Sequence, residues 1–92
     1  MLDLTIVKAA LRVTHNSDDD EIERLIASAT REYLEFSGED EISSDMFEGR
    51  ETVATGVILM VQADYDADPL DREKYRDAAK HLWGKHRLDF GL

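Results

Sequence analysis

"EIERLIASATREYLEFSG", residues 21–38, decides the fold class of this 92-residue chain. Its apolar side chains recur every three or four residues, which is the period of one face of an α-helix. These side chains are Ile22, Leu25, Ile26, Ala29, Tyr33 and Phe36. The stretch therefore predicts an amphipathic helix over about residues 18–37, which Gly38 ends.

The start of this helix is marked by carboxylates. Asp18 and Glu21 have the spacing of a capping box, in which each side chain accepts a hydrogen bond from the backbone N–H of the other residue. Asp19 and Asp20 lie between them in the first turn, where the helix dipole favours negative charge. Helix capping, rather than metal ligation, therefore explains this acidic run.

Residues 50–66 predict a second long helix of different character. Its apolar side chains cover nearly the whole circumference, which indicates a helix buried in the core and partly against another subunit. The run "GVILMV", residues 56–61, is also compatible with a strand. Its alanine-containing flanks and the lack of a partner strand in the sequence favour the helix.

The last helix is predicted to begin at Asp68-Pro69, with an aspartate N-cap and proline in the first helical position. It is expected to run to about Trp83 and to end at Gly84, leaving residues 84–92 as a C-terminal docking tail. The side chains expected to point inward are Leu70, Tyr75, Ala78, Ala79 and Leu82.

A short helix over residues 4–12, with Leu4, Val7 and Leu11 on one face, completes the predicted elements. The fold class is therefore all-α: a single domain over residues 1–92 containing a small bundle of about four helices. A long acidic loop separates the second and third helices, and Ile42, Met46 and Phe47 are its apolar anchors.

The stretch "DYDADPLDREKY", residues 64–75, begins like a calcium-binding EF-hand loop, with aspartates at its first, third and fifth positions. Such a loop needs glycine at position six and a bidentate glutamate at position twelve. These positions hold Pro69 and Tyr75. The helix start at Asp68 is the better explanation, and the sequence leaves cation binding at residues 64–71 open.

Composition limits the supports available to so small a domain. A chain of this size buries only part of its surface, and without cysteine it has no disulfide or thiolate metal site. Oligomerisation is the remaining common support. Because neither a signal-peptide pattern nor a membrane-length apolar stretch is present, we expect a soluble protein made in the cytoplasm.

Charge is distributed unevenly along the chain, whose net charge is −10. Residues 1–71 hold 18 acidic and 5 basic side chains, whereas residues 72–92 hold 3 acidic and 6 basic ones. The overall acidity argues against a protein that clamps nucleic-acid phosphates. The opposite net charges of these two parts of the chain indicate head-to-tail contact between copies or an acidic partner for the basic end. A third reading is that the unevenness serves solubility alone.

Catalytic patterns are lacking in the sequence. His15, His81 and His86 have no cysteine partners and no zinc-protease spacing. Ser28 has no flanking glycines of a nucleophile elbow, and no glycine-rich phosphate loop is found. We therefore expect a protein that is not an enzyme and that has no cofactor, metal or catalytic residue.

The C-terminal segment "KHLWGKHRLDF", residues 80–90, interleaves basic and aromatic side chains. This composition is compatible with nucleic-acid binding, with a protein contact, or with an ordinary last helical turn whose tryptophan packs in the core. The candidate contact residues are Trp83, Lys85, His86, Arg87 and Phe90.

The opening "LTIVKAALRVTHNSDDDEIERLIASATREYLEFSG", residues 4–38, resembles the small head-tail connector (adaptor) proteins of long-tailed phages and prophages. In that family a short helix reading like "VKxxLR" precedes an acidic turn and a second helix with a Leu-Ile pair, Ala, Tyr and a closing Gly. The matching residues here are Val7, Lys8, Leu11 and Arg12, then Asp18 to Glu21, then Leu25, Ile26, Ala29, Tyr33 and Gly38. After Tyr65 the family often has an Asn-Arg-type dipeptide, where this chain has "DADPLD".

The resemblance implies a structural virion protein at the head-tail interface. It implies a homo-oligomeric ring of about twelve copies with closed cyclic symmetry. This ring would bind beneath the portal protein after DNA packaging. Such a ring extends the DNA channel and offers a platform for a head-completion or tail protein. Its acidic wall would repel DNA phosphates and let DNA pass without sequence-specific binding. The candidate channel-facing residues are Glu39, Asp40 and Glu41.

A second function from a different class also fits the composition. A small acidic helical regulator, such as an antitoxin or anti-repressor, would cover a basic surface by mimicking the charge of nucleic acid. Such a module is a compact monomer or dimer, whereas a connector assembles into a ring.

Overall fold

The computed structural model describes residues 2–37, 51–65 and 68–89. Four α-helices make up these residues, and no strand occurs among them, so the predicted all-α fold is confirmed. The helices are α1 (Leu4–Leu11), α2 (Asp19–Ser37), α3 (Glu51–Tyr65) and α4 (Pro69–Asp89). Gly38, the acidic loop and Phe90 lie outside the described residues.

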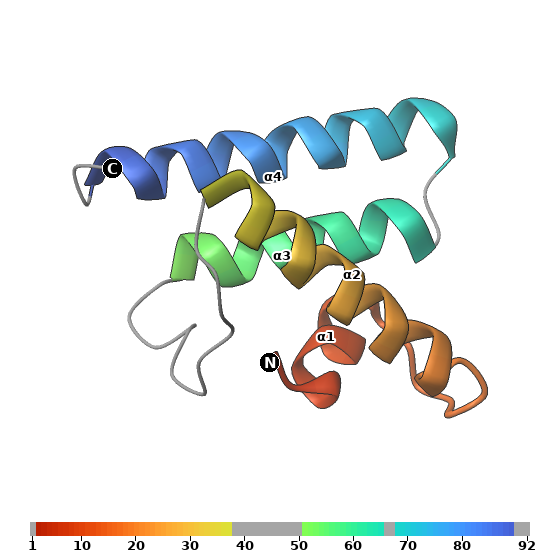
Figure 1. Cartoon of the computed structure of the whole chain (residues 1–92). Coiled ribbons are helices and arrows are strands. Elements are labelled where there is room, and N and C mark those ends of the chain that lie inside the picture. Colours follow the sequence, from red (N-terminus) through yellow and green to blue (C-terminus); the bar gives the residue numbers. More distant parts are fainter. Residues whose placement is uncertain (1, 38–50, 66–67, 90–92) are drawn as a thin grey trace.

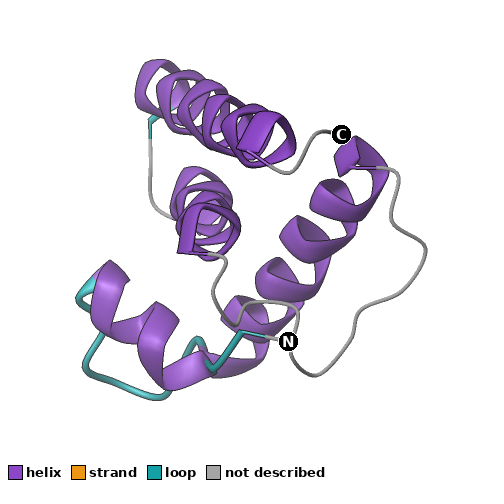
Figure 2. Cartoon of the chain, turned by 90° about the vertical axis from the view of Figure 1, so that its left-hand side faces the viewer, coloured by secondary structure: helices purple, strands orange, loops and turns teal. Residues whose placement is uncertain are grey.

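Helix α3 lies at the centre of the bundle. Its most extensive contacts are with α4, which runs back alongside it, and next with α2. Helix α1 packs against α2 and α3 but not against α4. Figures 1 and 2 both place α1 and α4 on opposite sides of α3. The bundle therefore has two outer helices that present different surfaces.

The core follows the apolar patterns of the sequence. The predicted stripe of α2 is buried, except that Phe36 is half-buried. Val7 is the buried residue of α1, and Leu4 and Leu11 pack beside it on the same face. Helix α3 is buried around most of its circumference, as predicted, although Ile58 and Leu59 are only partly covered. The buried residues of α3 are Val53, Gly56, Val57, Met60, Val61 and Ala63.

Trp83 joins the three long helices. Its side chain is only 1% exposed, and its indole N–H donates to the backbone carbonyl of Val53 in α3 at 3.3 Å. The ring meets Tyr33 of α2 edge-on, with centroids 5.5 Å apart, and lies 5.8 Å from the ring of Phe36. Edge-to-face aromatic pairs add stability beyond the area that they bury.

Gly56 makes room for this indole. A Cβ atom at this position would lie 2.3 Å from Nε1 of Trp83, closer than any van der Waals contact allows. A glycine in a helix normally weakens it. Here the absent side chain is what allows α3 and the tryptophan of α4 to approach each other.

Two helix starts have the side-chain caps that the sequence favours. The Asp3 carboxylate accepts a hydrogen bond from the backbone N–H of Thr5 at 2.7 Å. At α4, the Asp68 carboxylate accepts from the N–H groups of Leu70 and Asp71 at 3.1 and 3.0 Å. Since Pro69 is the first residue of α4, the predicted helix start at Asp68-Pro69 is confirmed.

The predicted end of α4 is wrong. The helix continues through Gly84 to Asp89, so residues 84–89 are helical and not a tail. Gly84 has no positive φ angle, and an interior glycine costs only about 1 kcal/mol relative to alanine. The residues that follow, Lys85 to Leu88, include good helix formers that offset this cost.

For two side chains of α4 the predicted inward orientation is wrong, because both are exposed. Leu70 is 73% exposed, and Ala78 is exposed as well. Ala79 is buried, while Tyr75 and Leu82 are half-buried. Leu70 precedes Ala79 by about two and a half helical turns, which places the two on opposite faces. Burial of Trp83 and Ala79 fixes the inner face and turns Leu70 outward.

The two helical glycines give a matched test of this packing. We predict that Gly56→Ala lowers the free energy of unfolding by about 1–3 kcal/mol, because the new methyl group overpacks the Trp83 site. The control, Gly84→Ala, has no atom within 4 Å of the new Cβ and should raise it by up to about 1 kcal/mol. Urea unfolding followed by circular dichroism measures both. Equal shifts in the two variants would contradict the packing account.

Candidate assembly surfaces

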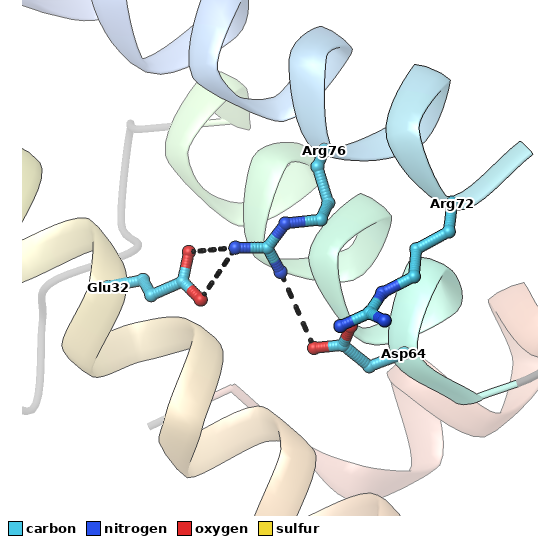
Figure 3. A network of polar contacts seen from close by, with 4 residues as sticks. All are labelled: Glu32, Asp64, Arg72 and Arg76. Atoms are coloured by element: carbon cyan, nitrogen blue, oxygen red, sulfur yellow. Dashed lines mark hydrogen bonds and ion pairs between the residues drawn. The ribbon is translucent and has the colours of Figure 1, made fainter. Parts of the chain in front are cut away.

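A network of charged side chains ties α4 to both other long helices (Figure 3). Nη2 of Arg76 lies 2.9 Å from each carboxylate oxygen of Glu32 in α2. Its Nη1 lies 3.6 Å from Oδ2 of Asp64 in α3, and Nε of Arg72 donates to Oδ1 of the same carboxylate at 3.1 Å. The Arg76 side chain is 26% exposed and that of Arg72 is 56% exposed. Arg76 is thus the better-shielded member.

Asp64, the first aspartate of the calcium-like stretch, is therefore held by two arginines. Its carboxylate faces α4, and Asp68 uses its own carboxylate on the first turn of that helix. Within the described part of the chain, no group of three or more His, Asp or Glu side chains is arranged to hold a metal ion. The geometry assigns Asp64 and Asp68 to joining and starting helices, and Asp66 lies outside the described residues.

The turn between α1 and α2 is fastened by a second set of contacts. Nζ of Lys8 lies 2.8 Å from Oδ1 of Asn16 and 2.7 Å from Oδ1 of Asp19. The Asp18 carboxylate accepts a hydrogen bond from the hydroxyl of Tyr65, at the end of α3, at 2.6 Å. These contacts fix α1 and its turn against the two neighbouring helices.

The capping box predicted for Asp18 and Glu21 is wrong. Helix α2 begins at Asp19, as the acidic run indicated, and the backbone carbonyl of Asp18 accepts the N–H of Ile22 at 2.9 Å. The Asp18 side chain, however, bonds to Tyr65, and the reciprocal side-chain bonds with Glu21 are not formed between these described residues. A long-range partner has replaced the local one.

An open pocket of about 360 Å³ lies beside this turn. Leu11 and Val13 supply its apolar lining, and Tyr65 forms another wall. Its charged and polar lining combines both signs of charge: Arg12, Thr14, His15, Asp18 and Glu21. His15 is exposed, as expected for a turn residue, and its Nδ1 accepts from the N–H of Ser17 at 3.3 Å. The recess is thus a polar surface feature.

The candidate contact residues of the C-terminus fall into three groups. Trp83 lies in the core, which is one of the readings that the sequence left open. The last turns of α4 contain Lys85, His86 and Arg87, of which the structure describes the helical backbone but not the side chains. Phe90 and the candidate channel residues Glu39, Asp40 and Glu41 lie outside the described residues altogether.

Two exposed apolar side chains were missed as candidate contacts. They are Ile6 in α1, 55% exposed, and Leu70 in α4. Helical spacing gives a signal for both, because each is off the stripe that faces the core: Ile6 directly precedes the buried Val7, and Leu70 is opposite Ala79. None of the helices in the described segments has the length and apolar character needed to cross a membrane.

Comparison with known protein families shows to which family the chain belongs. The family model described as phage gp6-like head-tail connector protein matches residues 1–82. This protein belongs to the gp6-like head-tail connector family. The match covers α1, α2, α3 and most of α4, including both sets of polar contacts. No curated protein and no solved structure matches the chain significantly.

Family membership gives the connector its general role. It is a structural component of a phage virion, and it contacts other head or tail proteins of the phage. The family is structural and generally not enzymatic. Membership thus favours the connector over the acidic regulator that the composition also allowed.

The charged network of the connector can be tested by comparing its two arginines. We predict that Arg76→Met, which keeps the apolar stem, lowers the free energy of unfolding by about 1 kcal/mol, because Glu32 loses its partner and Asp64 keeps only Arg72. Arg72→Met should cost less than about 0.5 kcal/mol, as expected for a mostly exposed pair. Urea unfolding at low and at molar salt measures both. An Arg76 effect that is no larger than that of Arg72, or that does not shrink with salt, would count against the network.

Proposed function

We propose that the connector forms a ring of about twelve copies beneath the portal, closed by cyclic symmetry. The ring extends the DNA channel and provides the platform for a head-completion or tail protein. Membership of the head-tail connector family carries this proposal.

The acidic loop supplies the channel wall in this proposal. Glu39, Asp40 and Glu41 are consecutive carboxylates in a loop long enough to carry a function. Like charge repels DNA phosphates over about a Debye length, near 10 Å at ordinary salt. Such a wall lets DNA slide without sequence-specific binding.

The C-terminal part of α4 supplies a partner contact. Lys85, His86 and Arg87 follow Trp83 on one continuous helix, so the buried indole fixes the direction in which this basic segment leaves the domain. With Phe90 as an aromatic anchor, the segment fits an acidic groove on the portal protein or on a neighbouring copy. A helix loses less conformational entropy on binding than the flexible tail expected from the sequence.

Sedimentation velocity of the full chain, alone and with portal protein, tests the ring and this contact together. We predict species much heavier than a dimer at high protein concentration or on the portal, and loss of portal capture in Lys85→Glu/Arg87→Glu through charge repulsion. The matched control is Arg24→Glu/Arg31→Glu, which reverses two exposed charges on α2.

A monomer or dimer under all these conditions would rule out the ring. Portal capture that survives in the α4 variant, or that is lost equally in the α2 control, would move the contact away from the C-terminal segment. Circular dichroism of both variants shows whether the helices remain formed.

The channel wall has its own test. We predict that replacing Glu39, Asp40 and Glu41 with lysine changes the free energy of unfolding by less than about 0.5 kcal/mol per site, as for most surface substitutions. Assembled particles should then release DNA more slowly, because the new cations attract phosphates. Single-particle ejection assays measure the rate. An unchanged ejection rate in folded, assembled particles would mean that these residues do not line the DNA channel.

A further inference from the structure

We draw no further inference here: the strongest candidate, the open pocket beside the turn between α1 and α2, sets the charge of Arg12 against the carboxylates of Asp18 and Glu21, and nothing in the structure shows which ligand or partner would fill it.

Discussion

The indole of Trp83, seated against Gly56, is the contact on which the rest of the structure depends. Helix α4 follows α3 closely in the chain. Its direction across the bundle is set by the contacts of the Trp83 ring with Gly56 of α3 and with Tyr33 and Phe36 of α2. Arg76, about two turns earlier, fastens the same helix face to Glu32 and Asp64. With that face held inward, Leu70 and Lys74 must face outward, and the basic end of α4 leaves the domain in a fixed direction.

This arrangement suits a protein whose role is to join other proteins. The buried core lies mainly in α2 and α3, while the outer helices α1 and α4 lie on opposite sides of α3 and each carries one large exposed apolar residue. The carboxylates of the acidic turns start helices or tie them together: Asp64 with two arginines, Asp68 at the start of α4, and Asp18 with Tyr65.

Local patterns predicted the fold well, and long-range contacts explain where they failed. The stripe of α2, the apolar circumference of α3 and the Asp68-Pro69 start are signals contained within a few residues, and the helices form where these signals lie. Glycine commonly ends a helix, so the sequence suggested that α4 ends at Gly84. In the structure α4 continues to Asp89, beyond the packed Trp83. The bond between Asp18 and Tyr65 spans 47 positions, and that between Glu32 and Arg76 spans 44, so neither has a local signal. The family resemblance, which rests on capping and apolar patterns, was confirmed by the family model. The charged C-terminal and loop residues stay predictions.

Electron micrographs of the full chain, alone and mixed with portal protein, test the central claim most directly. If the connector closes into a ring, the images should show annuli of uniform diameter with a central opening, seated coaxially on the portal where it is present. Compact particles of one or two copies in both samples would contradict the account. Open filaments would contradict closure into a ring.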